Sequence, residues 1–505
     1  MPPRIAFDNE KYLAEQTAAI IQRVERFSDK LYLEFGGKLL FDFHAARVLP
    51  GFDPNVKMRL LKTLEDRAEV ILCIFAGDIE KMKVRADFGI TYDADALKLM
   101  DDLGDRGVPV RAVVITRYEE QPAATAFRNR LERRGVQVFT HRFTRGYPTE
   151  IDVVVSESGY GANAHIQTHK PIVVVTGPGP GSGKLATCLS QLYHDHRQGI
   201  RSGYAKFETF PIWNLPLKHP VNVAYEAATA ELRDANQLDH FHLDAHNERA
   251  VNYNRDLEAF PLLRRIMERI TGKPCFYASP TDMGVNRAGF GIVDQEAAWE
   301  AGCQEVVRRY FRYACEHSMG LVGRDSVQRI ELLMDDLDLR PESRPVVAPA
   351  REAAERGRLQ GKGANGIYVG AALELPDGTI VTGTNSPLMH AAAALILVAA
   401  KELAGIPKER HLLPPAVIQS VSHLKKDVLG RKRVSLNGEE ALIALSIAAT
   451  SDPAAGAAMA RLAEFRGCEI HMTHMPTKGD EAGFRKLGVN LTADPLFTTN
   501  RLFVS

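Results

Sequence analysis

The chain has 505 residues, of which 45% are hydrophobic and 25% are charged. A chain of this length is too long for one hydrophobic core, so the sequence predicts two or three globular domains. The chain has 63 lysine and arginine residues and 63 aspartate and glutamate residues, so its formal charges balance. It therefore has no net positive charge that would favour nucleic acid or an anionic membrane as a partner.

Strand and helix patterns alternate through residues 1–202. Strands that are apolar along their whole length are typical of a parallel sheet covered by helices on both faces. We therefore expect a doubly wound α/β domain with a mostly parallel sheet, whose ligands would bind at the carboxyl ends of its strands. The predicted strands are 31–35, 70–75, 110–116, 136–140, 152–156 and 171–176, and the predicted helices include 93–103 and 123–134.

The most informative segment is the glycine-rich turn at 177–184, which reads GPGPGSGK and follows the predicted strand 171–176. A glycine-rich turn that opens a helix exposes backbone N–H groups to an anion, and Lys184 adds a mobile positive charge. The segment therefore predicts a P-loop-like, phosphate-binding turn. The predicted binding residues are Gly177, Gly179, Gly181, Ser182, Gly183, Lys184 and Thr187.

The turn departs from the phosphate-loop pattern G-x-x-x-x-G-K-[ST] at two positions. Pro178 stands where that pattern has its first glycine, and Leu185 stands where it has the hydroxyl that holds Mg²⁺. The nearest hydroxyl groups belong to Ser182 and Thr187. The alternative interpretation is a strand-to-helix turn that is rich in glycine and proline for geometric reasons alone.

Two other polar segments are expected at the carboxyl ends of strands. Gly77 and Asp78 follow the strand 70–75, and the run 156–161 follows the strand 152–156. Because carboxylates hold Mg²⁺ and accept protons, Asp78 is a candidate metal ligand or catalytic base.

Residues 203–339 are predicted to form a mainly helical segment that docks on the first domain. Two polar loops within it contain Arg255 and Arg287, which we predict as anion partners because a guanidinium binds phosphate through two hydrogen bonds. The alternative role of these loops is turn formation by their Asn, Asp, Pro and Gly residues. The loops are 252–256 and 277–287, and the predicted helices are 257–271, 294–315 and 326–337.

The segment 239–246, DHFHLDAH, concentrates three histidines and is predicted as a strand. On a strand, His240 and His242 share one face and Asp244 continues it, which is a metal-binding pattern in principle. Because no second ligand cluster follows at a fixed spacing, we prefer a polar strand face near a substrate pocket and predict no metal site.

A linker is predicted at 340–366, where prolines and then glycines interrupt the pattern, and a smaller α/β domain is predicted at 367–505. This domain begins with a hairpin that turns at 376–378 and a helix that starts with Ser386 and Pro387 and runs to residue 404. The remaining predictions are helices capped by Asn437 with Glu440 and by Asp452 with Pro453, and a strand at 469–473.

The six cysteines are scattered without a C-x-x-C pair, which is typical of reduced thiols in the cytoplasm. The most continuous apolar run, 391–400, is far shorter than the ~20 residues of a membrane-spanning helix. We therefore expect a soluble, cytoplasmic protein.

As a whole, the chain resembles a conserved bacterial family of proteins of similar length that is known only as a domain of unknown function. The resemblance covers nearly the full length of the chain and implies no particular reaction. The segments that carry it are 177–195, 251–261, 277–286 and 475–495.

A second resemblance is local. The sequence AALELPDGTIVTGTN at 371–385, followed by SPLMHAAAALILVAAKELAG, is similar to the hairpin and first helix of cytidine-deaminase-like domains. Those domains carry H-A-E and P-C-x-x-C, whereas this chain has His390, Ala391 and Ala392 and no P-C-x-x-C. The resemblance therefore implies a shared architecture without the zinc chemistry.

The leading functional hypothesis is an ATP-dependent phosphotransferase or NTPase that acts on a small metabolite, with ATP and Mg²⁺ as cofactors. Its candidate catalytic residues are Lys184, Asp78, Arg255 and Arg287. The alternatives are a nucleotide-independent enzyme for a phosphorylated metabolite and a non-catalytic ligand-binding protein. The expected partners are a small phosphorylated ligand and further copies of this chain in a homo-oligomer, without nucleic acid or membrane. Peptidase activity has no support, because the sequence contains neither H-E-x-x-H nor G-x-S-x-G.

Overall fold

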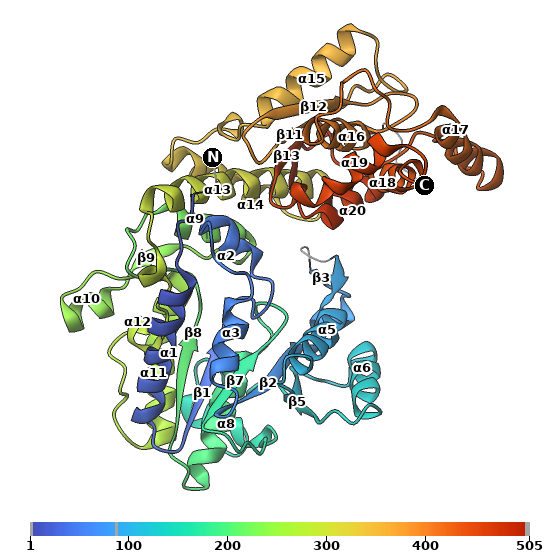
Figure 1. The fold of residues 1–505 in the computed structure, drawn as a ribbon. Helices are drawn as coiled ribbons and strands as arrows, with labels where there is room; N and C mark the ends of the chain where they lie inside the picture. The colour runs from blue at the N-terminus through green and yellow to red at the C-terminus, as the bar shows by residue number, and fades with distance from the viewer. Residues whose placement is uncertain (1–3, 86–88, 500–505) are drawn as a thin grey trace. The chain divides into compact units, whose positions relative to one another are not determined.

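The computed structural model describes residues 4–85 and 89–499, and the chain forms two compact units. The N-terminal unit contains Arg4–Glu226 and Arg233–Gly302. The C-terminal unit contains Ala227–Leu232 and the chain from Cys303 onward, so neither unit is one continuous stretch of sequence. The two units are described separately below, with the element labels of Figure 1.

The N-terminal unit is built on a six-stranded sheet in which every neighbouring pair of strands is parallel, with the order β6-β5-β2-β7-β1-β8. This confirms the predicted α/β class and parallel sheet. The central strands are buried along their length because helices cover both faces. The strands are β1 (Lys30–Phe35), β2 (Ala68–Phe75), β5 (Val110–Thr116), β6 (Val138–His141), β7 (Ile172–Thr176) and β8 (Ser202–Phe207).

Successive strand residues point to opposite faces of this sheet, and each face packs on its own helices. On one face, Leu72 and Ile74 of β2 pack with α5 (Tyr92–Gly104) and α6 (Pro122–Glu132). On the other face, Ile71 and Cys73 pack with helices α7 (Ile151–Val154), α8 (Lys184–Arg197) and α11 (Asn254–Thr271). The sheet is therefore doubly wound, as the sequence predicts.

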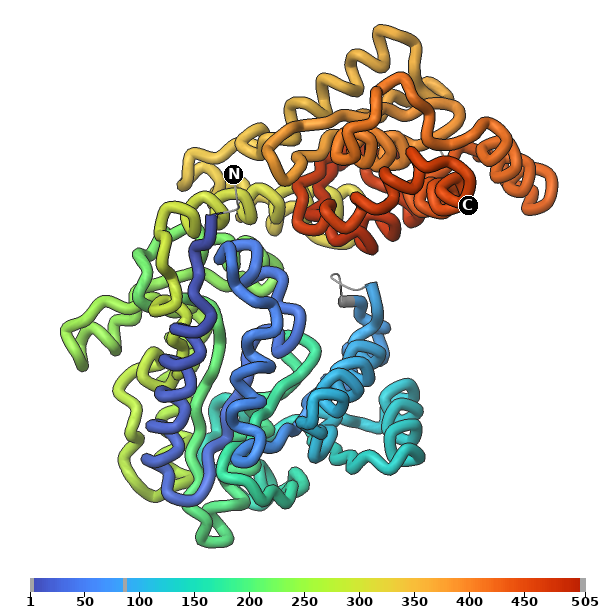
Figure 2. Tube along the Cα trace, viewed as in Figure 1, coloured from blue at the N-terminus to red at the C-terminus, as the bar shows by residue number. Residues whose placement is uncertain are grey.

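The N-terminal helix packs on a segment from late in the same unit. Figure 2 shows α1 (Asn9–Arg26, dark blue) beside the yellow-green segment that contains η3 (Ala288–Gly291). The side chain of Gln16 is buried in this contact, donates to the carbonyl of Val285 and accepts from the N–H of Arg287 at 2.9 Å. The other elements of this unit are α2 (Phe43–Val48), α3 (Val56–Thr63), α4 (Ala76–Glu80), β3 (Val84–Arg85), β4 (Ile90–Thr91), η1 (Tyr160–Ala162), α9 (Pro220–Ala228, whose last two residues belong to the C-terminal unit), β9 (Asn236–Leu238), α10 (His240–His246), β10 (Val251–Tyr253) and α12 (Pro280–Met283).

Two predicted strands of the N-terminal unit are wrong. The run at 152–156 lies in α7 and the residues after it, and its buried Val154 packs against the sheet from a helical turn. A short run of β-branched residues signals burial, which a helical turn can satisfy as well as a strand. The run 156–161 therefore does not follow a strand.

The histidine-rich segment is the other wrong prediction, because it forms α10. Asp239 precedes the helix as its N-cap, and its carboxylate accepts the N–H of His242 at 3.0 Å. On a helix, residues four apart share a face, so His242 is paired with His246 and not with His240.

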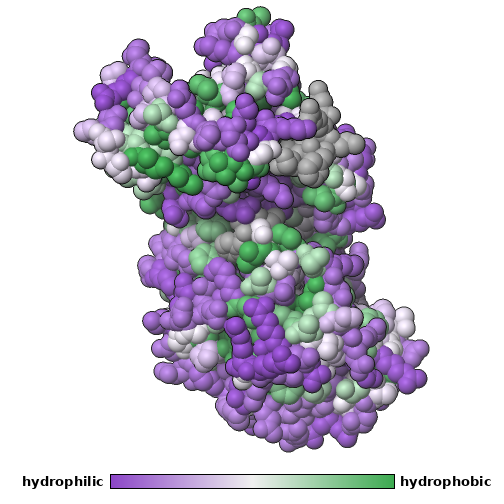
Figure 3. Space-filling model, turned by 90° about the vertical axis from the view of Figure 1, so that its right-hand side faces the viewer, coloured by the Kyte–Doolittle hydropathy of each residue, from purple (hydrophilic) through white to green (hydrophobic). Residues whose placement is uncertain are grey.

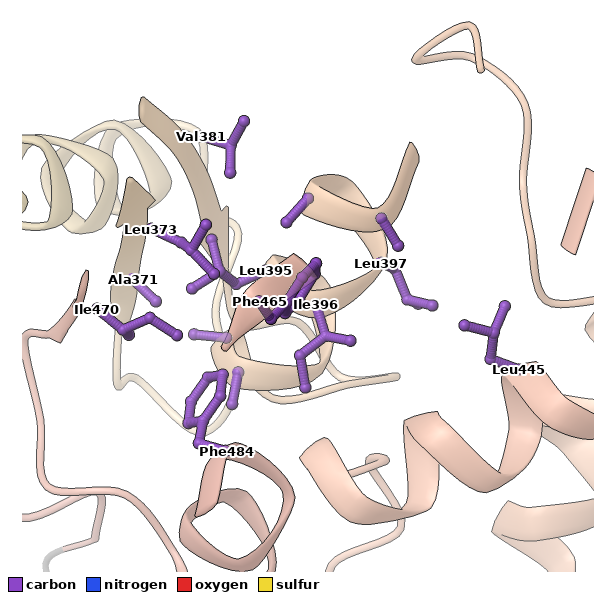
Figure 4. Packing of buried hydrophobic residues seen from close by; sticks show 14 of the residues in the cluster. Ala371, Leu373, Val381, Leu395, Ile396, Leu397, Leu445, Phe465, Ile470 and Phe484 are labelled. Carbon is purple, nitrogen blue, oxygen red and sulfur yellow. The ribbon is translucent and has the colours of Figure 1, made fainter. Parts of the chain in front are cut away.

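The C-terminal unit is a four-stranded mixed sheet with the order β12-β11-β13-β14. Strand β11 (Gly370–Glu374) is antiparallel to β12 (Ile380–Thr384) and β13 (Glu469–Met472), and β14 (Asn490–Ala493) is parallel to β13. In Figure 4, Leu373 and Ile470 from the sheet pack with Leu395, Ile396 and Phe465, all of which are fully buried. The hairpin and the strand at 469–473 are confirmed.

The helices of this unit confirm two of the three predicted starts. Asn437 and Glu440 form a capping box at α18, and Asp452 caps α19. The predicted start at Ser386 is wrong: α16 begins at Ala391, because Met389 forms a β-bridge with Leu436 and Ser386 caps only a turn. The helices are α13 (Gln295–Ser318, which begins in the N-terminal unit), α14 (Arg324–Asp336), α15 (Val347–Leu359), α16 (Ala391–Leu403), α17 (Pro415–His423), α18 (Gly438–Ala448), α19 (Pro453–Ala460) and α20 (Lys478–Leu487), with short turns η2 (Ala230–Leu232), η4 (Pro341–Ser343), η5 (Leu424–Val428) and η6 (Leu462–Phe465).

Most of the surface shown in Figure 3 is hydrophilic, and hydrophobic residues occur on it in small groups. No helix within residues 4–85 and 89–499 is both long enough and apolar enough to cross a lipid bilayer. All six cysteines are free thiols.

Because His141, the last residue of β6, is buried, we expect the protein to lose stability in acid. The side chain is buried, and its Nε2 donates to the carbonyl of Ala164 at 3.2 Å. Burial lowers the pKa of His141 to about 4, against about 6.5 in the unfolded chain. The unfolded state therefore binds the proton more readily, so the contribution of His141 is complete above pH 6.5 and is lost as the pH falls toward 4.

We expect His141 alone to remove about 2 kcal/mol from the free energy of unfolding between pH 7 and pH 5. Urea denaturation at the two pH values measures this loss in the wild type and in His141→Gln, which keeps a donor but does not titrate there. The exposed His169, changed to glutamine, is the control and should keep the wild-type dependence on pH. An equal pH dependence in His141→Gln and the wild type would contradict the assignment.

Candidate functional site

The glycine-rich turn lies at a point where the connections of the sheet change sides. The connections that leave β1 and β2 run toward β6, whereas the one that leaves β7 runs back toward β8. Right-handed crossovers then place the helices after β1 and β2 on one face and α8 on the other, as the packing of α5 and α8 shows. Such a change opens a crevice at the carboxyl ends of the strands, where ligands of doubly wound proteins bind.

Three glycines of the turn are required by close packing. A side chain at Gly177 would overlap the carbonyl oxygen of Cys73 in β2, and one at Gly179 would lie 2.6 Å from the ring of Tyr92 at the start of α5. Gly183 is the N-cap of α8, has a φ of +89°, and a Cβ there would lie 2.7 Å from Thr116. The turn is therefore held against the ends of its neighbouring strands.

Lys184 folds back over the turn. Its ammonium group lies 3.4 Å from the carbonyl oxygen of Gly179 and 3.4 Å from the hydroxyl of Ser182. Ser182 is buried, and its own carbonyl accepts the hydroxyl of Thr116 at 2.8 Å. The cation of Lys184 therefore lies beside the backbone that the sequence predicts to hold an anion.

Arg117 is a residue of this site that the sequence analysis missed. It follows the last residue of β5, adopts a φ of +50°, donates to the carbonyl of Gly181 and stacks 3.4 Å from the centre of the Phe75 ring. Asp78, in α4, lies near it: burial raises the pKa of Asp78, and the charges of Lys83 and Arg117 oppose that rise. The sequence contained one signal for Arg117. A charged residue directly after a buried strand lies at the edge of the sheet where ligands bind.

A narrow cleft of about 20 Å³ lies next to the turn, with room for little more than a water-sized group. Its other walls are Gly37 and Lys38, which follow β1, and Lys98 of α5, which pairs with Asp102. The glycines and lysine after β1, at 36–38, are a second signal that the sequence analysis did not use. The remaining lining residues are Leu39, Leu40, Phe41, Asp95, Leu99, Thr176, Gly177 and Pro178.

A partly buried group of charges reaches Gly36, the residue before the cleft residues Gly37 and Lys38. Lys206 at the end of β8 bonds Asp256 at 2.6 Å and Glu208 at 3.0 Å. The side chain of Glu208 crosses Gly36, where a Cβ would overlap it, and burial raises the pKa of Glu208 against the lowering effect of Lys206. An acid with a raised pKa beside a cleft is suited to proton transfer.

Three predicted site residues have other partners than the turn, and one of them, Arg255, lies near the charged group of Lys206, Asp256 and Glu208. Thr187 is fully buried, and its hydroxyl accepts the thiol of Cys73 at 3.4 Å, so it faces the sheet. Arg255 pairs with Asp234 at 3.3 Å, and the Arg287 guanidinium lies 5.3 Å from the centre of the Phe290 ring. The structure thus groups Lys184 and Ser182 with the glycines, whereas Asp78 pairs with Lys83 at 3.9 Å.

Family comparisons cover nearly the whole chain. Residues 5–338 match the family model described as "Domain of unknown function DUF1846, N-terminal", and residues 342–503 match the corresponding C-terminal model. A UPF0371 protein of Clostridium botulinum strain 657 (type Ba4) is 55% identical over 500 residues, and one of Clostridium tetani strain Massachusetts (E88) is 54% identical over 501 residues. Each alignment covers 99% of both chains, and neither name assigns an activity.

Proposed function

Since the chain belongs to the DUF1846 family, whose function is unknown, we propose from its own residues that it binds a nucleotide or a phosphorylated small metabolite at the glycine-rich turn 177–184. The observation that carries the proposal is the position of this turn, at the change of crossover direction next to β7, with Lys184 folded over it. That position combines a ligand-binding edge with the start of a long helix and a cation.

The proposed binding mode uses backbone groups and lysines. The N–H groups between Gly179 and Gly183 would face the phosphate oxygens, and the positive end of the α8 dipole would add to their attraction. Lys184 would exchange its contacts with Gly179 and Ser182 for the phosphate. Lys38 and Lys98, on the opposite walls of the cleft, would neutralise further negative charge.

As an ATP-dependent phosphotransferase or NTPase, the protein would use Lys184 to stabilise the charge that develops on the transferred phosphoryl group. Position 185 is leucine, so Mg²⁺ would take its protein ligand from a carboxylate, with Asp78 the predicted one. This is the leading form of the proposal.

A second form needs no nucleotide and is favoured by one observation. Thr187, the hydroxyl nearest to the position for Mg²⁺ on the helix, is buried against Cys73. In this form the turn holds the phosphate of a metabolite, and Glu208 beside Gly36 exchanges a proton with it.

We expect ATP or inorganic phosphate to raise the melting temperature of the wild type, because a ligand at 100 times its Kd adds about 2.7 kcal/mol. Thermal unfolding with ATP, GTP, ADP or phosphate, with and without Mg²⁺, measures the effect. Lys184→Ala removes a charge-assisted hydrogen bond and should weaken binding about 10- to 100-fold. The exposed Lys62 on α3, changed to alanine, is the matched control.

The ligands separate the two forms of the proposal. Stabilisation by ATP that exceeds the effect of phosphate and depends on Lys184 supports the nucleotide form, whereas an equal effect of phosphate supports the metabolite form. The proposal is wrong if none of these ligands changes the melting temperature, or if Lys184→Ala responds as the wild type does.

A further inference from the structure

Helices α10 and α12 bring two histidines and one carboxylate together. His242 and His246 are one helical turn apart on α10, and their ring centres lie 4.6 Å apart. Asp282 of α12 approaches both: its Oδ1 lies 3.5 Å from Nδ1 of His242, and its Oδ2 lies 3.0 Å from Nε2 of His246. One possible ligand atom from each side chain lies within 4.8 Å of the other two.

The two helices are fixed to each other by Asp239, which is almost fully buried. One of its carboxylate oxygens accepts the N–H of His242 at 3.0 Å. The other accepts the hydroxyl of Thr281 at 2.6 Å and the N–H of the same residue at 3.2 Å. The Asp239 carboxylate therefore ties the backbone at His242 to the residue before Asp282.

A further hydrogen bond holds the His242 ring in place. The hydroxyl of Ser279, the N-cap of α12, lies 3.0 Å from Nδ1 of His242 and accepts the N–H of Asp282 at 3.0 Å. Nε2 of His242 is buried and has no hydrogen-bond partner in the described part of the chain. The polar contacts of this ring are thus concentrated at Nδ1, on the side of Asp282.

From this geometry we propose that His242, His246 and Asp282 bind a divalent transition metal of the zinc type. Zinc holds nitrogen and oxygen ligands at about 2.0–2.2 Å in a tetrahedral arrangement, which separates the ligand atoms by about 3.3 Å. The distances from the two Asp282 oxygens to the histidine nitrogens, 3.0 Å to His246 and 3.5 Å to His242, lie on either side of this value. Two imidazoles and one carboxylate suit zinc and its neighbours in the first transition row better than Mg²⁺ or Ca²⁺.

The proposed centre has an open coordination position. Three protein ligands leave a fourth tetrahedral position for water or for an oxygen of a small ligand. His246 has 41% of its side chain exposed, so solvent reaches at least one ligand of the proposed centre. The site shares no ligand with the glycine-rich turn, so the proposal stands whether or not that turn binds phosphate.

Metal binding to the full-length protein, without a histidine tag and after treatment with EDTA and desalting, tests the proposal. Calorimetric titration with Zn²⁺ should show one strong site per chain, and Co²⁺ should give the visible absorption of a tetrahedral centre. His246→Ala and Asp282→Asn should each weaken Zn²⁺ binding at least tenfold and abolish the Co²⁺ band. His240→Ala, an exposed histidine of the same helix, is the matched control and should bind as the wild type does.

Circular dichroism melting of each variant separates loss of ligand from loss of fold. His246 is exposed, so His246→Ala is expected to melt within a few degrees of the wild type without metal. Absence of saturable Zn²⁺ binding by the wild type overturns the proposal. So does unchanged binding by a folded His246→Ala or Asp282→Asn protein.

Discussion

Arg344→Ala is expected to lower the free energy of unfolding of the C-terminal unit by about 3–5 kcal/mol, because it takes one of two guanidinium partners from Glu469 and leaves two strand carbonyls without a donor. Arg344 has no exposed side-chain surface and pairs with Glu469 of β13. It also donates to the carbonyls of Ile470 at 3.1 Å and Asn490 at 2.9 Å, so it fastens two neighbouring strands. Alanine would remove all of these bonds at once.

Two opposing effects act on the pKa of Glu469. Burial acts to raise the pKa of Glu469, but the guanidinium groups of Arg308 and Arg344 outweigh it and bring the pKa below its ordinary value. Arg308 alone bonds it at 2.8 and 3.1 Å. Without Arg344, the ionised form loses part of this support.

Urea denaturation followed by circular dichroism measures the effect of Arg344→Ala. Arg358→Ala is the control, because Arg358 also pairs with a glutamate, Glu355 at 2.6 Å, but both side chains are more than half exposed. An exposed pair contributes at most about 1 kcal/mol. Equal losses in the two variants would show that burial of Arg344 does not set its contribution.

Gly183→Ala is expected to destabilise the N-terminal unit by about 3 kcal/mol and to remove any stabilisation by phosphate ligands. A φ of +89° costs a residue with a side chain about 1–2 kcal/mol, and forcing atoms into a packed region costs about 1–3 kcal/mol more. The new Cβ would lie 2.7 Å from Thr116, whose hydroxyl is bonded to the carbonyl of Ser182. The start of α8 would therefore have to move.

Gly181→Ala separates the cost of the positive φ from the cost of the close contact. Gly181 has a φ of +72°, but the nearest atom to a Cβ there is the Arg117 side chain at 4.0 Å. Only the backbone cost of about 1–2 kcal/mol applies, so this variant should remain closer to the wild type than Gly183→Ala does. Thermal unfolding with and without phosphate measures both effects in each variant. Similar melting temperatures for the two variants would mean that the contact with Thr116 is relieved at little cost.

The sequence predicted strands best where both faces of a strand are buried, because such a strand is apolar along its whole length. The strand at 110–116 has the predicted bounds, since its residues contact helices on both faces of the sheet. The run at 152–156 has the same composition but lies in a helical turn, because β-branched residues report burial more reliably than they report backbone geometry. Asp239 explains the other error: a helix cap bonded to α12 outweighs the alternation that suggested a strand.

The candidate site was predictable in its backbone and less so in its side chains. Glycines that bring a turn against a strand leave a local signature, which is why 177–184 stands out. Arg117 and Lys38 come from other strand ends, and only the order of strands in the sheet brings them to the turn. Thr187 is the opposite case. It lies near the turn in the sequence, but three residues into α8 its side chain points to the core.

The interrupted sequence of the C-terminal unit limits how the protein can be taken apart. Ala227 and Ala230 share an apolar cluster with Tyr313, Val327 and Ile330. Residues 233–302, which separate the two alanines from Tyr313 in the sequence, belong to the other unit. A fragment that ends at residue 302 keeps the two alanines without this cluster, and a fragment that begins at residue 303 lacks them. A single proteolytic cut therefore releases neither unit whole.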